Sequence, residues 1–213
     1  MELTPKDFAQ QAQNLYGKDP LASQHASDFY YQILDVPNIL SIILQVLRRY
    51  FDLYSNYAAL AVVSHFVHNQ WNDLDQETQI RLQKVLFSMV EMPRARHPKI
   101  KEYAANILST LAYYLFPDNW STLFEDILKP STLLIFHFFV IKLNTNNNLL
   151  ASKRIFIRGI ISERLPEIVQ ILFQASTPIS LMTFSSIISL IPSDIFFDEN
   201  LIFLPLLSFF NNY

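Results

Sequence analysis

Two histidines in the first half of the chain have a spacing that could bind a metal ion. His65 and His68 lie three residues apart, so an α-helix would bring both imidazoles to one face. The nearest further ligands, Asp73 and Asp75, follow the expected end of that helix. Because a zinc site needs further protein ligands, we interpret the pair as surface or hydrogen-bonded histidines and predict no metal site.

Paired carboxylates and a serine next to a histidine are two further patterns that could support catalysis. The acidic pairs are Asp73/Asp75 and Glu125/Asp126, and Ser64 directly precedes a histidine. Both acidic pairs fall at helix ends, where acids commonly occupy turns or exposed faces. Neighbouring residues on a helix point about 100° apart, so this serine and histidine do not form a catalytic pair. We predict no catalytic residue and expect that the chain is not an enzyme.

A single basic cluster precedes one of the expected helices. Several cations on a short segment raise the local potential and can contact phosphate groups, even on an acidic protein. Its arginines and lysines are therefore candidate RNA-binding residues, and an ordinary solvated turn is the alternative interpretation. The cluster, which lies on a proline-bounded turn, consists of Arg94, Arg96, His97, Lys99 and Lys101.

The composition excludes most familiar sites for nucleotides, thiolates and metals. The 213 residues include two glycines and no cysteine. A phosphate-cradling loop needs glycines at fixed spacing, and Gly17 and Gly159 are too far apart to form one. The lack of cysteine excludes disulfides, iron–sulfur clusters and every zinc site that uses sulfur. The net charge of −3 gives no overall attraction to nucleic acid. We predict no cofactor.

Helical periodicity is the dominant structural signal. From Ile100 to Leu115, for example, apolar residues recur at spacings of three and four, which is typical of an amphipathic helix. Prolines and asparagines interrupt such stretches at steady intervals, and the scarcity of glycine disfavours tight hairpin turns, so we predict an all-α fold. The expected helix pairs are 22–35 with 37–50, 54–71 with 75–91, 98–116 with 118–128, 131–143 with 149–173, and 179–190 with 197–209.

The spacing of these pairs predicts how they assemble. Their period of about 35 to 45 residues is the range of two-helix HEAT-type repeats. We predict a HEAT-type α-solenoid, a superhelix of about five antiparallel helix pairs, with a compact helical bundle as the alternative. Pro166 is expected to kink or restart its helix. The longest uncharged stretch, Ile168–Ser193, is interrupted by Pro178 and Pro192, so no membrane span is predicted.

Two stretches resemble the amino-terminal repeats of the exportin family, which belongs to the importin-β (karyopherin) superfamily. The first is Ala59–Leu74, a helix followed by tryptophan, a short polar pair and leucine. The second is Ile100–Leu128, whose Phe-Pro-x-x-Trp-x-x-Leu-Phe-x-Asp-Ile-Leu segment is similar to the Tyr-Pro-x-x-Trp-Pro-x-Phe-Phe-x-Asp-Leu-Leu pattern of that family. The family-motif residues are Trp71, Phe116, Pro117, Trp120, Phe124 and Asp126.

The same motif has a physical interpretation that does not depend on the family. Pro117 should end one helix and set the backbone for the first turn of the next. Trp120, Leu123 and Ile127 provide an apolar stripe that can be buried against the preceding helix. We therefore interpret Trp71 and Trp120 as core residues rather than as platforms for a ligand.

The resemblance implies a nuclear export receptor. It implies that residues 1–213 form one α-solenoid unit, with residues 1–129 as importin-β-like amino-terminal repeats and the more apolar residues 130–213 as continuing repeats. Residues 158–169 look like a later helix of the tRNA-exporting branch of the family, which implies tRNA as the cargo. Nucleoporins are further partners that the resemblance implies, together with shuttling between nucleus and cytoplasm.

The resemblance also implies a place for the small GTPase Ran. In the family the second helices of the first repeats line a concave face that binds Ran-GTP, and we count residues 75–91 as such a helix. The alternative is a generic HEAT-repeat scaffold that binds a peptide or helix and is not coupled to Ran. The candidate Ran contacts, which lie off the apolar stripe of that helix, are Gln76, Gln79, Gln83 and Lys84.

The last part of the sequence is strongly apolar. Leu201–Phe210 contains no charged residue. An apolar helix at the end of a helical stack exposes a face that further repeats or a partner must cover. We therefore expect self-association of the chain through this end.

Overall fold

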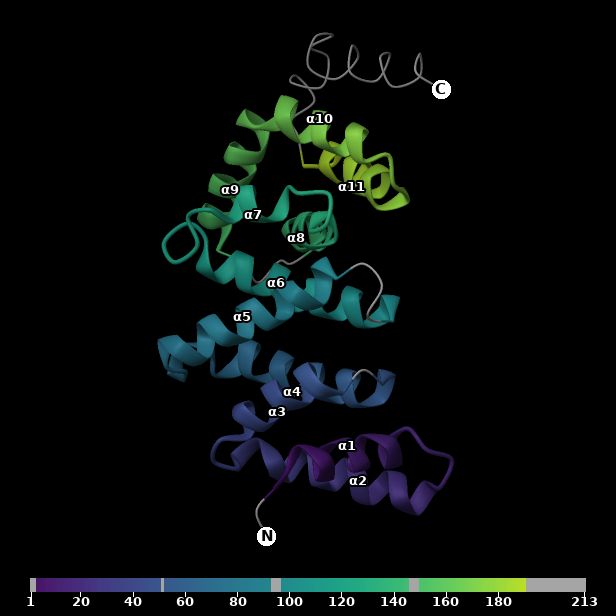
Figure 1. Ribbon diagram of the computed structural model, residues 1–213. Helices are drawn as coiled ribbons and strands as arrows, with labels where there is room; N and C mark the ends of the chain where they lie inside the picture. Colours follow the sequence, from purple (N-terminus) through teal and green to yellow (C-terminus); the bar gives the residue numbers. More distant parts are fainter. Residues whose placement is uncertain (1–2, 51, 93–96, 146–149, 191–213) are drawn as a thin grey trace. The chain divides into compact units, whose positions relative to one another are not determined.

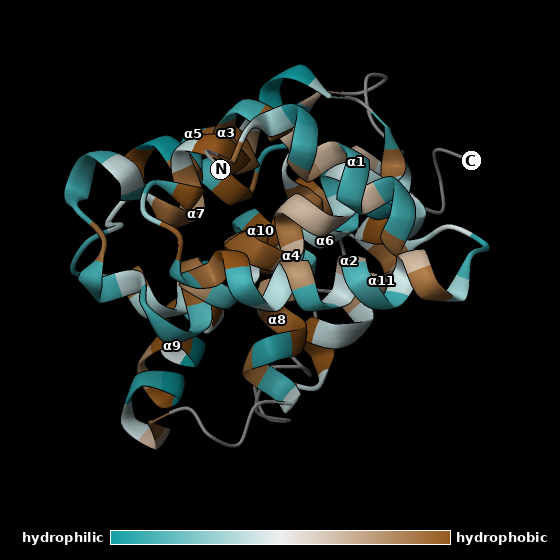
Figure 2. Cartoon of the chain, turned by 90° about the horizontal axis from the view of Figure 1, so that it is seen from below, coloured by the Kyte–Doolittle hydropathy of each residue, from teal (hydrophilic) through white to brown (hydrophobic). Residues whose placement is uncertain are grey.

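The protein is all-helical over the part of the chain that its structure describes. A computed structural model describes residues 3–50, 52–92, 97–145 and 150–190. These ranges contain α-helices and short 3-10 turns and no β-strand (Figure 1). Brown apolar and teal polar residues alternate along the helices in Figure 2, as amphipathic helices require. The all-α prediction is confirmed.

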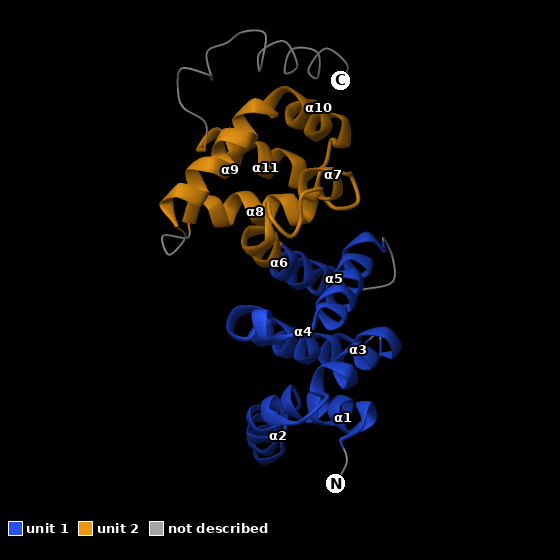
Figure 3. Ribbon diagram, turned by 90° about the vertical axis from the view of Figure 1, so that its left-hand side faces the viewer, with its two compact units in different colours: residues 1–108 blue, residues 109–213 orange. Residues whose placement is uncertain are grey.

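The chain divides into two compact units, residues 1–108 and 109–213. Figure 3 colours them separately and shows that the boundary falls within one helix, α6 (Pro98–Leu115). This boundary differs from residue 129, where the composition becomes more apolar. Each unit buries its own set of apolar side chains, so each is described by itself.

The first unit contains the first five helices and the beginning of α6. Two short 3-10 turns, η1 and η2, precede α3 and α5. In chain order its elements are α1 (Pro5–Leu15), α2 (Pro20–Gln32), η1 (Ile33–Asp35), α3 (Ile39–Arg49), α4 (Leu53–Asn69), η2 (Trp71–Asp73) and α5 (Gln76–Glu91).

Polar side chains fix where these helices begin. Thr4 and Asp7 form a reciprocal capping box at the start of α1. The carboxylates of Asp19, Asp52 and Asp75 accept hydrogen bonds from first-turn backbone N–H groups of α2, α4 and α5. Such a cap typically stabilises a helix by about 1 kcal/mol. Asp75 is thus a helix cap, which accounts for one member of the acidic pair Asp73/Asp75.

The helices of the first unit pack on one another in two rows. Helix α1 packs on α2, α3 and α4, and α3 packs on α4 and α5. Helices α1, α3 and α5 therefore form one side of the unit, and α2 and α4 form the other (Figure 3). Each pair covers apolar surface that its neighbour leaves open.

The predicted helix pairing is incomplete at its start because it omits α1. Residues 37–50 are predicted to pack on residues 22–35; α3 contacts η1, the last part of that range, and packs more extensively on α1 and α4. Helix α1 buries Phe8, Ala9 and Ala12, and alanines contribute little apolar area to a periodic pattern. The omission shifts the count of helices by one, so α5 lies on the side of α1 and α3.

The second unit contains the end of α6 and further helices that pack in series. Helix α8 packs on α7 and α11, α11 packs on α10, and α10 packs on α9. The bounds of these helices are α7 (Leu123–Ile127), α8 (Leu133–Thr145), α9 (Ala151–Glu163), α10 (Leu165–Ala175) and α11 (Pro178–Ile188).

The predictions made from two prolines have different outcomes. The predicted restart at Pro166 is confirmed, because α9 ends just before it and α10 carries this proline in its first turn. Pro117 follows the end of α6 as predicted, but the next helix begins only at Leu123. Turns over residues 116–122 replace the first part of the predicted helix 118–128.

Two features of the carboxyl-terminal part bear on the remaining predictions. The predicted helix 197–209 and the apolar segment 201–210 lie outside the described residues, so the expected self-association stays a prediction. Most of the uncharged stretch 168–193 folds as two separate helices, α10 and α11. Among the helices that the structure describes, none is long and apolar enough to cross a membrane.

Candidate partner-binding surface

The family-motif residues of the second unit form a buried aromatic cluster. Phe116, Trp120 and Phe124 are at most 5% exposed, and Phe116 packs edge-on against Phe124 with ring centroids 5.4 Å apart. The Trp120 indole donates a hydrogen bond to Oδ2 of Asp126 at 2.9 Å, and the Thr122 hydroxyl donates to the same oxygen at 2.9 Å. We call these five residues, with the rings that they contact, the Trp120 cluster.

The acidic pair Glu125/Asp126 has structural partners instead of a shared reaction site. Oε1 of Glu125 lies 3.1 Å from Nη1 of Arg164, whose Nε lies 2.9 Å from Oε2 of Glu167. The guanidinium carbon of Arg164 also lies 5.3 Å from the centroid of the Phe124 ring. Hydrogen bonding to Glu167 raises the pKa of Arg164, so this side chain is a permanent positive charge beside the cluster.

The two histidines of α4 bond within their own helix. Nδ1 of His68 lies 2.7 Å from the carbonyl oxygen of Ser64, and Nδ1 of His65 lies 3.3 Å from Nδ2 of Asn69. Over the described ranges, no group of three or more histidine, aspartate or glutamate side chains is placed to hold a metal ion.

The candidate Ran contacts lie on α5, and one of them has a structural task. The Gln79 amide donates hydrogen bonds to the carbonyl oxygens of Trp71, at 2.8 Å, and Leu74, at 3.2 Å, and so holds the turn before α5. Trp71 itself is 6% exposed. Of the other three candidates, Gln76 and Lys84 are exposed and Gln83 is half-buried.

The structure describes two of the four candidate RNA-binding residues. Lys99 and Lys101 lie on the first turn of α6, where Lys99 is exposed and Lys101 is half-buried. Arg94 and Arg96 lie outside the described residues. The cluster therefore stays a prediction from the sequence.

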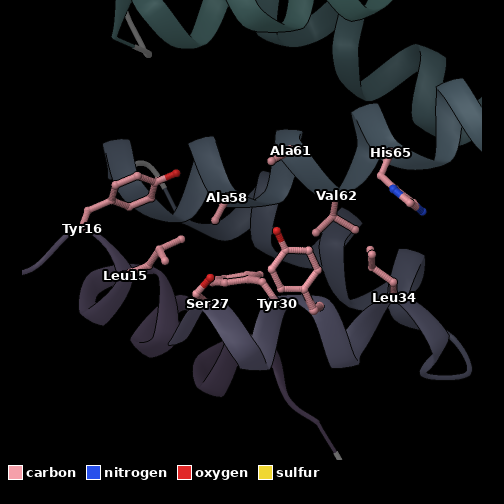
Figure 4. Close-up of a pocket in the computed structure, with 10 residues that line it drawn as sticks. Leu15, Tyr16, Ser27, Tyr30, Leu34, Ala58, Ala61, Val62 and His65 are labelled. Carbon is pink, nitrogen blue, oxygen red and sulfur yellow. The ribbon is translucent and has the colours of Figure 1, made fainter. Parts of the chain in front are cut away.

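A groove between α2 and α4 is the feature that the sequence patterns did not indicate. It has a volume of about 230 Å³, and Figure 4 shows Tyr30 and Leu34 on one side facing Val62 and His65 on α4. We call it the tyrosine groove. Its lining consists of Leu15 and Tyr16 from the end of α1, Ser27, Tyr30 and Tyr31 from α2, Leu34 from η1, and Ala58, Ala61, Val62 and His65 from α4.

Exposed tyrosines extend the groove beyond Tyr16, the residue that follows α1. The Tyr16 ring stacks on Tyr54, with centroids 5.2 Å apart and an interplanar angle of 16°, and lies edge-on to Tyr57. Tyr57 in turn contacts Tyr103 of α6 at 5.0 Å. Tyr16, Tyr54 and Tyr57 are each about 40% exposed, and Tyr31 is 75% exposed. Aromatic rings with a polar tip are suited to an interface that is partly apolar and partly wet.

Tyr30 fixes the floor of the groove. Its hydroxyl donates a hydrogen bond to the carbonyl oxygen of Phe8 at 3.0 Å, and its ring lies edge-on to the Phe8 ring at 5.0 Å. Burial raises the pKa of Tyr30 well above its usual value. Because the hydroxyl stays protonated, this bond joins α2 to α1 throughout the physiological pH range.

A second hollow adjoins the tyrosine groove through Leu34, which lines both. This hollow, about 310 Å³ in volume, lies between the starts of α3 and α5. Three carboxylates line it, those of Asp35, Asp73 and Asp75, so we call it the acidic hollow. Hydrogen bonds from Thr78 lower the pKa of Asp75, which keeps its charge negative at neutral pH.

The arrangement of these groups is suited to binding a partner. Apolar and tyrosine side chains line one hollow and carboxylates line the next, a combination that can hold side chains of a partner. The residues in the sequence that could have indicated this surface are the tyrosines at positions 16, 31, 54 and 57. Their rings are not fully buried and are therefore available to a partner. Models of known protein families give no match to the chain, and no curated protein matches it either.

Proposed function

We propose that this chain is an exportin-type nuclear export receptor, a HEAT-type α-solenoid that binds Ran-GTP and carries tRNA. The observation that carries the proposal is the stacking of the first unit, in which α3 packs on α1 and α5 packs on α3. Stacked helix pairs build such solenoids, and their rows of helices are surfaces for partners. The burial of Trp71 and Trp120 adds support, because the residues that carry the resemblance are those that its core would need.

A receptor of this kind works through coupled binding and needs no catalytic group. Ran and the cargo would each favour the same curvature of the helical stack, so each would strengthen the binding of the other. Nucleoporins would be met during passage between nucleus and cytoplasm. Gln76, Gln83 and Lys84 are the proposed Ran contacts that the chain can expose, since the Gln79 amide bonds to the backbone. Counting α1 makes α5 a first helix of its pair, so these contacts rest on exposure and no longer on the rule that second helices bind Ran.

A pull-down of the full chain with Ran tests this proposal. We expect binding to Ran locked in its GTP form and much weaker binding to the GDP form. The double variant Gln83→Ala/Lys84→Glu should reduce binding, whereas Arg81→Gln, on the same helix and in an exposed ion pair with Glu77, is the matched control. A folded chain without any nucleotide-dependent binding would overturn the transport proposal.

The tRNA component has its own experiment. Reversing the charges of Arg94, Arg96, Lys99 and Lys101 together should weaken tRNA binding and flatten its dependence on salt, because fewer phosphate contacts release fewer counterions. Binding is measured by electrophoretic mobility shift at several salt concentrations. Lys6→Glu/Lys18→Glu is compared with Lys99→Glu/Lys101→Glu, because both double variants change the net charge by the same amount. Unchanged affinity would leave the cluster as an ordinary solvated turn.

The tyrosine groove favours a second candidate function. A scaffold that binds a peptide or helix, without coupling to Ran, needs an unfilled apolar groove between helices. The groove between α2 and α4 has this form. A chain that binds peptides but not Ran would fit this function and exclude the first.

A further inference from the structure

The tyrosine groove and the acidic hollow adjoin at Leu34, and we call the two together the binding surface. Leu34 lines both, and α4 supplies His65 to the groove and Phe66 to the hollow. A ligand that fills the groove at this end therefore meets the carboxylates of the hollow next. The surface has an apolar, aromatic end and an acidic end.

The size of the groove indicates the kind of group that it can accept. Its volume of about 230 Å³ is below the range of about 300–1,000 Å³ that is usual for pockets of drug-sized ligands. Ala61, at the lip of the groove, is exposed and leaves room above α4. One or two side chains of a peptide fit such a groove better than a whole cofactor does.

The linings of the two hollows contain three aspartates and no lysine or arginine, and the segments that supply most of them are flanked in the sequence by Lys18, Arg48 and Arg81. Residues 19–47 and 52–80, which supply all of both linings except Leu15 and Tyr16, contain no lysine or arginine. Neither Asp35 nor Asp73 forms an ion pair with a described residue. The same two segments contain seven acidic residues, which are Asp19, Asp28, Asp35, Asp52, Asp73, Asp75 and Glu77.

We propose that this surface binds a basic peptide segment of a partner protein, anchored by an apolar side chain in the tyrosine groove. Lysine or arginine residues next to that anchor would lie against Asp35 and Asp73 in the acidic hollow. An arginine can also stack on the Tyr31 ring, which is 75% exposed. The inference deepens the scaffold function proposed above and rests on it.

The charges distinguish this ligand from other macromolecules. RNA and an anionic membrane both carry negative charge, and the carboxylates of the surface would repel them. An uncharged apolar peptide would fill the groove but leave Asp35 and Asp73 without partners. A basic segment with an apolar anchor uses both parts of the surface.

The proposal is tested by selecting peptides from a random display library on the full chain. We expect the enriched peptides to combine an aliphatic or aromatic residue with at least two lysines or arginines and to carry net positive charge. One enriched peptide is then synthesised, labelled and titrated by fluorescence anisotropy. Its affinity should fall as salt is raised from about 50 to about 500 mM, because salt screens exposed charges.

Two variants locate the binding. Ala61→Trp fills the groove from an exposed position and should weaken peptide binding about tenfold or more, the scale on which interface anchors act. Ala151→Trp, at an exposed position on α9, is the matched control and should bind like the wild type. Asp35→Asn/Asp73→Asn should weaken binding and flatten its salt dependence, while Asp75 is left intact because it caps α5. Circular dichroism melts check that each variant folds.

Three outcomes would overturn the inference: no enrichment, enrichment of acidic or uncharged peptides, or binding that a folded Ala61→Trp variant retains in full. Labelled tRNA is titrated in parallel. If the wild type binds no peptide and Ala61→Trp loses tRNA binding, the groove would be assigned to nucleic acid instead. Nucleotide-dependent Ran binding alongside any of these results would leave the transport proposal standing. The two proposals thus fail in different experiments.

Discussion

The Trp120 cluster of the second unit and the tyrosine groove of the first unit are both rich in aromatic residues, but they differ in exposure. In the cluster, Phe116, Trp120 and Phe124 are at most 5% exposed, and the indole bonds to Asp126. In the groove, Tyr16 is 40% and Tyr31 75% exposed. Burial area is what makes an aromatic ring stabilise a fold, whereas an exposed ring gains its area only with a partner.

This difference in exposure separates residues that stabilise the fold from residues that can bind a partner. The conspicuous motif of the sequence belongs to the cluster, where its side chains are used within the unit. The residues best placed for a partner belong to the groove, which carries no motif. Substitutions in the cluster should therefore change the free energy of unfolding, and substitutions in the groove should change binding.

The largest effect is expected for Trp120→Ala. It removes an indole that is 5% exposed and leaves a cavity in its place, so the free energy of unfolding should fall by about 3–5 kcal/mol. Urea denaturation followed by circular dichroism measures the loss. A decrease below about 1 kcal/mol would mean that the cluster does not carry the stability of its unit and would remove the contrast with the groove.

A smaller effect is expected for Asp126→Ala. This change removes the carboxylate that accepts hydrogen bonds from Trp120 and Thr122, at a cost of about 1–3 kcal/mol. Asp126→Asn retains one carboxamide oxygen as an acceptor and should lose less. If both variants unfold at the wild-type urea concentration, the two bonds contribute nothing measurable and packing alone holds the cluster.

The second unit should also respond to pH through His137. This residue is 6% exposed, and its Nδ1 lies 3.1 Å from the Thr183 hydroxyl, which donates to the Ile179 carbonyl oxygen. Burial lowers the pKa of His137 below the ordinary 6.5. Between the lowered pKa and 6.5 the unfolded chain binds more protons, so the free energy of unfolding should fall as the pH falls through this window.

His137→Gln provides the comparison for the pH effect. The variant should lose less stability than the wild type between pH 7.5 and a pH of about 5.5, measured by urea denaturation at each pH. His25→Gln, at an exposed position on α2, is the matched control and should follow the wild type. Identical slopes for the wild type and His137→Gln would show that the buried histidine has no part in the pH dependence.

The sequence predicts the helical fold well where apolar stripes are long and less well where they are weak. Helix α6 buries a dense stripe and is predicted almost to its ends. Helix α1 buries one large residue, Phe8, between alanines, and so escapes a hydrophobic pattern. The helix expected from residue 118 starts later because turns follow Pro117, and proline spacing alone does not predict where the chain resumes a helix.

The candidate surface depends on packing between helices, which a linear pattern does not contain. Periodicity gives no indication that Tyr31 lines a groove with residues of α4. The helix count also matters, since the omission of α1 changes which side of the unit α5 occupies. The proposed Ran contacts on α5 and the tyrosine groove on α2 and α4 are therefore different surfaces, and variants can separate them.

The smallest effect on stability is expected for Tyr31→Ala in the tyrosine groove. The side chain is 75% exposed, so the free energy of unfolding should change by no more than about 0.5 kcal/mol. Peptides selected on the groove should nevertheless bind more weakly, because the ring offers a face to an apolar or guanidinium group. Urea denaturation and anisotropy titration on the same preparation give both numbers. A loss of stability above about 1 kcal/mol would show that Tyr31 belongs to the packed part of the unit. Unchanged peptide affinity would show that Tyr31 lies outside the binding surface. Either result would contradict the contrast between the two aromatic regions.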